Sequence, residues 1–189
     1  MKALTALLLG LTLISGCSTF LTATRDGPIE DNQGTRTLGS VVDDGLIETK
    51  VTVNVNKAHP DMQSEARIQV TSFNGIVLIV GQVPSADMKP LAEQAAANVQ
   101  RVKVVHNELT VGERLSILAR NQDSLITTNA KTRMLADSNV PGRRIKVTTE
   151  AGIVYLLGLV TRAEADLAVE SVKQVAGVQR IVKLFEYID

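Results

Sequence analysis

A long internal repeat constrains this chain more than any other feature of its sequence. Fifteen residues that begin at Arg67 recur 77 positions later, beginning at Arg144, and eight of the fifteen are identical in register. The identical positions include both glycines of the segment, Gly75 and Gly81. Self-similarity at a fixed spacing indicates a duplication. We therefore expect the 189 residues to contain two copies of one structural unit.

Each copy carries the same order of predicted elements. An amphipathic helix is followed by an alternating strand, a glycine turn, a more apolar strand, a second helix and a last strand. Asp44 and Asp123 are the expected N-caps of the first helices, and Thr161 with Glu164 fits a capping box at a second helix. The other second helix is expected to open at Ser85. The predicted elements otherwise cover residues 44–57, 67–71, 76–80 and 102–111 in the first copy and 123–137, 144–148, 153–157 and 178–188 in the second.

The N-terminus has the pattern of a secretory signal. An apolar stretch over residues 3–14 is close to signal-peptide length and short of the roughly 20 residues that span a membrane. Ser15 and Gly16 then precede Cys17, the one cysteine of the chain. This order resembles the lipobox of bacterial lipoproteins, which implies that residues 1–16 are removed and that Cys17 is acylated. The alternative is an ordinary secretory signal with an incidental cysteine nearby.

The residues after Cys17 lack sustained periodicity as far as residue 42, and we predict that they form a flexible tether. The residue after the cysteine is Ser18, whereas lipoproteins kept at the inner membrane usually carry aspartate there. The resemblance therefore implies an anchor in the outer membrane, facing the periplasm. We divide the mature chain into a tether over 17–42, a first domain over 43–111, a linker over 112–119 and a second domain over 120–189.

The repeated motifs resemble the BON domain family of bacterial periplasmic and outer-membrane proteins. The resemblance rests on Val70-Thr71, Asn74-Gly75 and Gly81 in the first copy and on Val175-Ala176-Gly177-Val178 before the last strand of the second. Arg101 stands where the first copy would carry the glycine of that last motif. The resemblance implies an α+β chain of two tandem BON domains. Each would be αββαβ, with a small three-stranded mixed sheet packed against two helices.

The same resemblance implies a function without catalysis. By resemblance to lipoproteins with two BON domains, we expect the chain to bind anionic phospholipid and support envelope integrity, and kinship implies an association with the cell-division site. We accordingly expect a monomer that works without a cofactor, with an anionic phospholipid membrane as its partner. The competing hypothesis is a tethered periplasmic adaptor, which binds another envelope protein through a sheet edge or the cleft between the domains.

Charge distinguishes the two copies. The chain as a whole has 20 Lys+Arg and 20 Asp+Glu, and this balance gives no support to a basic nucleic-acid binder. Residues 43–111 carry a net charge of −2, and residues 120–189 carry +2. A basic domain beside anionic lipid gains about 1 kcal/mol for each Lys or Arg at the surface. A difference of this size can also be ordinary surface variation.

The first helix of the second copy has the composition of a membrane-contacting surface. At 3.6 residues per turn, Ile126, Ala130 and Met134 share the side that suits the core. Apolar tips with neighbouring cations suit the boundary between acyl chains and phosphates, and the chain has no tryptophan to act as an aromatic wedge. The predicted phospholipid-binding residues are Leu125, Thr128, Lys131, Thr132, Arg133 and Leu135. The alternative is that the two leucines of this set, Leu125 and Leu135, pack between the domains.

No pattern typical of catalysis occurs in the sequence. His59 and His106 lie in a predicted loop and a predicted strand, and neither belongs to a hydrolase, zinc or phosphate-loop motif. Asp43 and Asp44 at a predicted helix start favour interaction with the helix dipole over metal binding. We therefore predict no catalytic residue, no metal ligand and no cofactor-binding residue, and an enzyme is the least favoured class.

Overall fold

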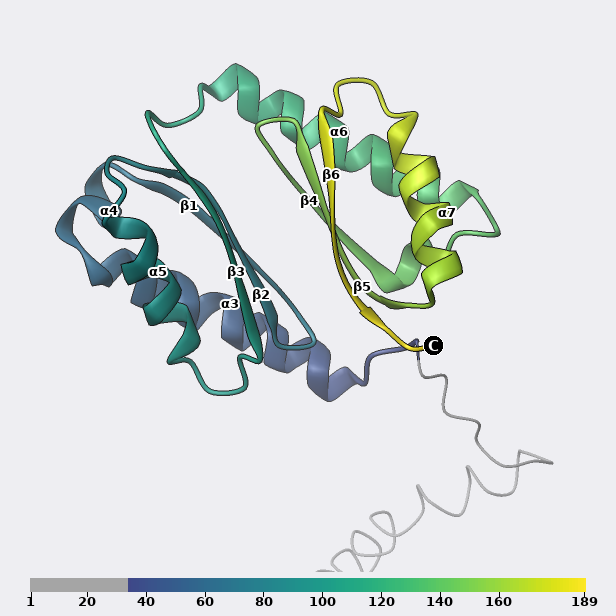
Figure 1. Ribbon diagram of the computed structural model, residues 1–189, viewed down its shortest axis with the longest axis horizontal. Coiled ribbons are helices and arrows are strands. Elements are labelled where there is room, and N and C mark those ends of the chain that lie inside the picture. Colours follow the sequence, from purple (N-terminus) through teal and green to yellow (C-terminus); the bar gives the residue numbers. More distant parts are fainter. Residues whose placement is uncertain (1–33) are drawn as a thin grey trace, which may run out of the picture. The chain divides into compact units, whose positions relative to one another are not determined.

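The computed structural model describes residues 34–189 (Figure 1), and these residues form one compact unit. The first domain contains α3 (Leu38–Ala58), α4 (Pro60–Ser64), β1 (Arg67–Phe73), β2 (Ile76–Val83), α5 (Met88–Ala97) and β3 (Val104–Val111). The second contains α6 (Ile117–Ala136), η1 (Gly142–Arg144), β4 (Ile145–Glu150), β5 (Ile153–Val160), α7 (Arg162–Lys173) and β6 (Arg180–Tyr187). The predicted signal peptide, Cys17 and the tether as far as residue 33 lie outside the described residues. Within residues 34–189, no helix is both long and apolar enough to cross a membrane.

The two sheets have the same mixed topology, which confirms the predicted α+β architecture. In each domain the central strand pairs antiparallel with the strand before it and parallel with the strand after it, in the orders β1-β2-β3 and β4-β5-β6. Two-residue turns join the antiparallel strands, and their residues have positive φ at Asn74-Gly75 and Ala151-Gly152. The parallel connections run through the helices α5 and α7. The predicted glycine turns are therefore confirmed.

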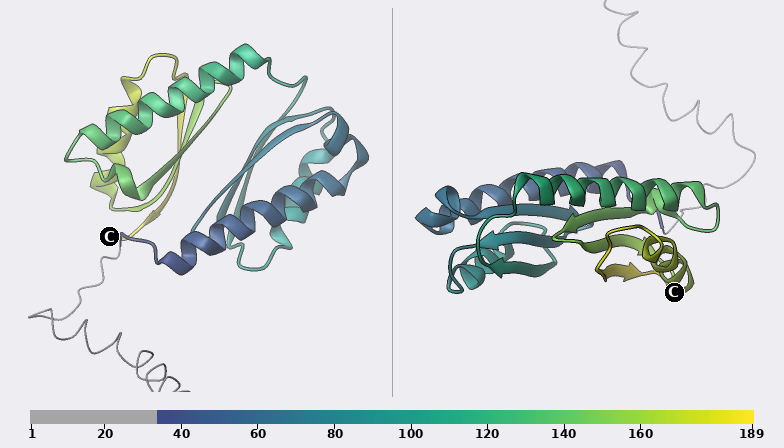
Figure 2. Two further views of the ribbon diagram at one scale, coloured as in Figure 1. Left: turned by 180° about the vertical axis from the view of Figure 1, so that it is seen from behind. Right: turned by 90° about the horizontal axis from the view of Figure 1, so that it is seen from above.

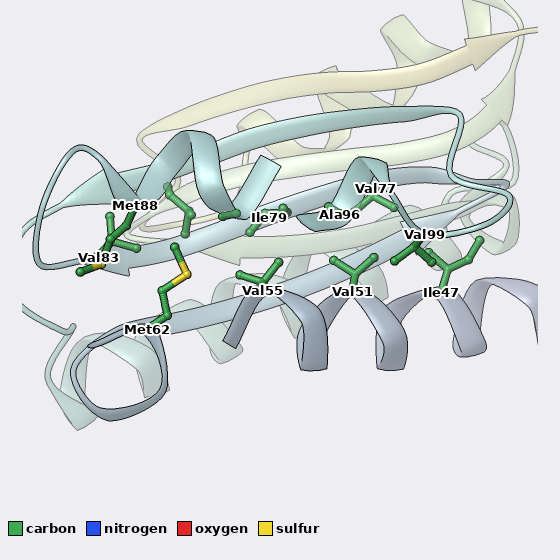
Figure 3. Packing of buried hydrophobic residues seen from close by; sticks show 12 residues of the cluster. Ile47, Val51, Val55, Met62, Val77, Ile79, Val83, Met88, Ala96 and Val99 are labelled. Carbon is green, nitrogen blue, oxygen red and sulfur yellow. The ribbon is translucent and has the colours of Figure 1, made fainter. Parts of the chain in front are cut away.

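Both long helices of each domain pack on one face of its sheet. In Figure 3, Ile47, Val51 and Val55 of α3 point towards the strands and α5, where they meet Val77 and Ile79 of β2. The second domain repeats this arrangement with α6 and α7 against β5. Its buried core includes Ile126, Ala130, Met134, Val154, Leu156, Ala165, Ala168 and Val172. The core-facing side predicted for the first helix of the second copy is thus confirmed.

The other face of each sheet is covered by the sheet of the other domain. Residues of both sheets share one buried apolar cluster, made up of Phe73, Leu78, Val80, Tyr155, Leu157, Leu159 and Leu184. Burial, with the charge of Glu108, raises the pKa of Tyr155 to about 12. The hydroxyl oxygens of Thr71 and Thr148, which are equivalent positions of the repeat, lie 3.0 Å apart. Contact between equivalent residues indicates an approximately twofold packing of the two copies.

Polar contacts at the linker connect the same two sheets. The buried carboxylate of Glu150 accepts hydrogen bonds from Arg67, at 2.6 and 2.7 Å, and from the side chain of Gln82 at 2.7 Å. The side-chain oxygen of Gln82 in turn accepts the backbone N–H of Leu115 at 3.0 Å. The guanidinium of Arg114 donates to backbone carbonyls at the end of α4. The linker is thus bonded to the first domain, and the contacts of Arg67 and Gln82 with Glu150 join the two sheets directly.

The first helix of each copy begins earlier than predicted. Thr37 caps α3, which starts at Leu38, and Ser116 caps α6, which starts at Ile117. The prediction that the aspartates are N-caps was wrong, since both lie inside helices. The last five residues assigned to the tether, 38–42, and the last three assigned to the linker are therefore helical.

Asp44 instead connects its helix to the tight turn of the sheet. Its buried carboxylate accepts the backbone N–H groups of Asn74 at 2.8 Å and Gly75 at 3.0 Å, and the hydroxyl of Ser72 at 2.7 Å. Burial raises the pKa of this carboxyl, but the hydrogen bonds from Gly75, Ser72, Asn74 and Arg36 outweigh burial and hold the pKa below its ordinary value.

Asp123 has the same role in the second domain. Its carboxylate accepts the backbone N–H groups of Ala151 at 2.9 Å and Gly152 at 2.8 Å. The aspartates are 79 positions apart, whereas the strands repeat at 77, because the connection from helix to strand is two residues shorter in the second copy. The duplication has thus conserved the contact from helix to turn, although the spacing has changed.

The second helices differ in how well their starts were predicted. The capping box at the start of α7 is confirmed, since Thr161 and Glu164 each bond the backbone N–H of the other. In the first domain α5 begins at Met88 rather than at Ser85, and its N-cap, Asp87, makes no capping hydrogen bond with its side chain.

We expect Asp44→Ala to lower the free energy of unfolding by about 2–3 kcal/mol, because it leaves buried donors of the turn without an acceptor. Urea unfolding of the mature chain measures this loss. The matched control is Asp43→Ala, which removes a partly exposed carboxylate that pairs with Arg101, and it should change stability little.

The loss caused by Asp44→Ala should also depend on pH. Since the pKa of Asp44 is lowered on folding, its stabilising contribution is complete above the unfolded pKa of about 4 and is lost as the pH falls through the native pKa. The stabilities of the parent chain and the variant should therefore converge below about pH 4. A gap that stays constant on acidification would contradict this role.

Candidate membrane-contact face

The helix α6 has a buried side and an exposed side that differ in chemistry. On the exposed side, Leu125 is 64% exposed and Leu135 is 51% exposed. The alternative in which these leucines pack between the domains is therefore wrong. The buried side consists of Asp123, Ile126, Ala130 and Met134.

Four of the six predicted site residues lie together on the exposed side of α6. Leu125, Thr128, Thr132 and Leu135 are all exposed and follow one another at spacings of three and four residues, so they form one row along the helix. The hydroxyl of Thr128 donates to the carbonyl of Ser124 at 2.9 Å. The row therefore offers an apolar surface with few unsatisfied polar groups.

Lys131 lies apart from this row and has a structural role. It is half-buried, and its Nζ donates to the carbonyl oxygens of Ile145 at 2.6 Å and Gly142 at 3.3 Å. Burial, together with the positive charges of Arg36 and Lys146, lowers its pKa below the ordinary value. The structure thus places this ammonium group against the start of β4.

Arg133 lies on the opposite flank of the row. Its side chain is exposed and donates to the side-chain oxygen of Gln174, which follows α7. A shallow hollow of about 440 Å³ opens here, and its lining includes Thr132, Arg133, Gln174 and Val175. A guanidinium at the rim of a hollow, next to an apolar row, is an arrangement suited to a phosphate group at the surface of a membrane.

Two further apolar residues extend the exposed row, and the sequence analysis missed them. Ile117 and Leu118, in the first turn of α6, are 68% and 79% exposed. They were missed because the helix was expected to begin at Asp123. Ser116 directly before these apolar residues was the available signal, since serine is a favoured N-cap.

The histidines have no contacts that suggest catalysis. The Nδ1 atom of His59 accepts the backbone N–H of Asp61 at 3.2 Å and caps the short helix α4. His106 is half-buried on β3, in register with Leu78. Over residues 34–189, no group of three or more His, Cys, Asp and Glu side chains is placed to hold a metal ion. A second hollow, of about 350 Å³, lies at the start of α3, and its lining includes Asp43, Ile47 and Arg101.

The fold and the sequence together define the class of this protein. The profile of the BON domain family matches residues 43–113 and 122–189, which is most of the chain. The chain belongs to the BON domain family.

A relative that matches over nearly the whole chain places it in the bacterial outer membrane. It is 37% identical over 187 residues to the outer membrane lipoprotein DolP of Haemophilus influenzae, covering 97% of this chain and 95% of the relative. It is also 37% identical over 153 residues to the 21 kDa hemolysin of Actinobacillus pleuropneumoniae, covering 81% and 78%. The osmotically-inducible protein Y of Escherichia coli is 31% identical over 147 residues, covering 76% and 72%. None of these names describes an enzyme, and the protein is an outer-membrane lipoprotein.

We expect Lys131→Met to lower the free energy of unfolding by about 1 kcal/mol, because two carbonyl oxygens lose a charged donor while the methylene stem stays packed. Part of this loss is offset, because the variant no longer buries a charged ammonium group. Urea unfolding measures the change. Arg133→Met is the matched control, and its exposed position should leave stability unchanged; equal losses in both variants would show that Lys131 has no special structural role.

Proposed function

We propose that this lipoprotein binds anionic phospholipid through the exposed side of α6, with the acyl group of Cys17 as its permanent anchor. The observation that carries the proposal is the continuous row of Leu125, Thr128, Thr132 and Leu135 on the exposed side of this helix. Large apolar residues on a protein surface are usually scattered singly. Exposed leucines along one side of a helix, with a guanidinium beside them, are typical of a helix that lies in the membrane interface.

The tether makes a weak interaction sufficient. A short linker gives a second contact an effective concentration in the millimolar range, so α6 needs only modest intrinsic affinity once the chain is anchored. Partial burial of Leu125 and Leu135 in the acyl boundary supplies affinity of that order, at about 25 cal/mol for each Å² of apolar surface removed from water.

Preference for anionic lipid rests on the cations of the second domain. Arg133 is exposed beside the row, and residues 120–189 carry a net charge of +2 against −2 for residues 43–111. Lys131 was expected to contact phosphate directly, and its bonds to the carbonyls of Ile145 and Gly142 favour a supporting role instead. Support of envelope integrity, at the division site, stays part of the proposal on the strength of the family resemblance.

The test is flotation of the mature chain with vesicles, using Cys17→Ser so that no acyl group contributes. We expect binding to vesicles that contain phosphatidylglycerol, weak binding to pure phosphatidylcholine, and loss of about tenfold in affinity on Leu125→Glu. Arg133→Glu should reduce binding to the anionic vesicles. It should neither make that binding more sensitive to salt nor strengthen binding to phosphatidylcholine.

The matched control is Leu167→Glu, because Leu167 is 44% exposed on α7 of the same domain and lies outside the row. It should bind vesicles as the parent chain does. Binding to neither type of vesicle would contradict the proposal and favour the tethered adaptor, in which these surfaces contact another envelope protein. Equal losses in Leu125→Glu and Leu167→Glu would show that α6 is not the site.

A further inference from the structure

Exposed apolar residues are concentrated on two helices, and only one of these belongs to the proposed site. Of the thirteen large hydrophobic residues exposed within residues 34–189, four lie on α6 and five on α3. The residues on α3 are Leu38, Val41, Val42, Leu46 and Val53, which are 87%, 46%, 62%, 52% and 45% exposed. A concentration of this kind on a helix surface indicates a contact with another apolar surface.

The start of α3 is free of charge as well as apolar. Residues 38–42 have the sequence Leu-Gly-Ser-Val-Val, and the first turn contains no acidic residue. The side of α3 that packs against the core consists of other residues, which include Ile47, Val51 and Val55. The exposed residues at the start of α3 therefore contribute little to folding, and their exposure calls for another explanation.

The chain that enters α3 is fixed in place. Arg36 donates to the carboxylate of Asp44 at 2.6 Å, and its guanidinium lies 3.9 Å from the centre of the Phe73 ring, which belongs to the cluster between the sheets. Gly34 is buried, and a Cβ atom there would overlap the guanidinium of Arg144 in the second domain. Because these contacts involve both domains, the tether ends at a defined point beside the start of α3.

That point is close to the anchor along the chain. Gly34 is 17 residues after Cys17, so the acyl group can lie no more than about 60 Å from it. The apolar start of α3 thus belongs to the part of the folded unit that the anchor holds closest to the bilayer by covalent linkage. Its effective concentration at the membrane is accordingly high.

The two helices also occupy the same edge of the folded unit. Each packs over the first strand of its own sheet, β1 or β4, and these strands meet at Thr71 and Thr148. The right-hand view of Figure 2 shows α3 and α6 along one edge of the folded unit and α5 and α7 along the opposite edge. A polar contact also crosses this edge, since Nζ of Lys146 on β4 donates to the carboxylate of Glu48 on α3 at 2.5 Å.

We infer that the exposed residues at the start of α3, namely Leu38, Val41, Val42 and Leu46, are a second membrane contact that acts with α6. The occupant is the acyl boundary of the bilayer that holds the Cys17 anchor. The inference deepens the proposed function and assigns to the first domain a contact that its net negative charge would not suggest. The acidic domain meets the bilayer through apolar side chains, and the basic domain adds the attraction for phosphate.

The decisive experiment measures the insertion of single labelled positions. With Cys17→Ser the chain has no cysteine, so an environment-sensitive fluorophore can be attached separately at Val42→Cys, Leu125→Cys and Glu170→Cys. Glu170 is the control, because its side chain is 65% exposed and its helix α7 lies along the opposite edge of the folded unit (Figure 2). An N-terminal histidine tag on vesicles of phosphatidylglycerol and phosphatidylcholine with a nickel-chelating lipid replaces the acyl anchor, so every variant stays at the surface.

We expect labels at positions 42 and 125 to shift to shorter emission wavelengths and to be quenched by a lipid-borne quencher, while the label at 170 does neither. Insertion at 125 without insertion at 42 would overturn this inference and leave the proposed function standing. Insertion at 42 alone would support the contact at α3 but overturn both the role proposed for α6 and the joint action of the two helices. A shift at 42 that appears without vesicles, and grows with protein concentration, would show that a second copy covers α3 and would equally overturn it.

Substitutions give a second, independent measurement. Val42→Glu should weaken binding of the untagged Cys17→Ser chain to anionic vesicles by about tenfold, and Val42→Leu should leave it unchanged or strengthen it. The stability of both variants in urea should equal that of the parent chain, because Val42 is 62% exposed. Loss of binding with unchanged stability separates a contact residue from a structural one.

Discussion

The arrangement depends on one constraint, which is that each three-stranded sheet is apolar on both faces while its own helices cover only one. Seven of the eight residues of β2, and seven of the eight of β5, are buried. An uncovered sheet face of this kind has to meet another apolar surface. The duplication supplies that surface, since the second copy presents the same face, and equivalent residues such as Thr71 and Thr148 meet between them. The interface is therefore as much a core as the interior of either domain.

Packing sheet against sheet places the helices on the outside and decides which surfaces are left for function. The helices α3 and α6 both carry a core-facing side that folding requires and an outer side that it does not. Selection on solubility alone would favour polar residues on the outer sides, yet most of the exposed large hydrophobic residues of the described chain lie there. The proposed contact with lipid would account for this distribution. The fixed junction at Gly34 and Arg36 then links the anchor to that same region.

Much of the fold could be predicted from local patterns, and the errors have physical causes. The repeat, the glycine turns, the core positions of α6 and the capping box of Thr161 are local features, and each was found. Asp44 and Asp123 resembled N-caps because aspartate before an apolar stretch is a common helix start. Their buried carboxylates bond the N–H groups of a turn about 30 residues away, and no local pattern reveals such a partner. For the same reason Lys131 resembled a free cation on a helix face, although carbonyl groups beyond the helix bind it.

The sequence by itself determined the number of domains, their order of elements and the apolar residues available on the helices, and it predicted a lipobox at Cys17. These properties are local, since they depend on residues within one or two turns or within one repeat. Only the tertiary structure decided which of those apolar residues are exposed and which cations are already bonded. It also decided that α3 and α6 share one edge of the molecule. These outcomes depend on how two sheets bury their second faces against each other, and that packing joins residues separated by about 80 positions along the chain.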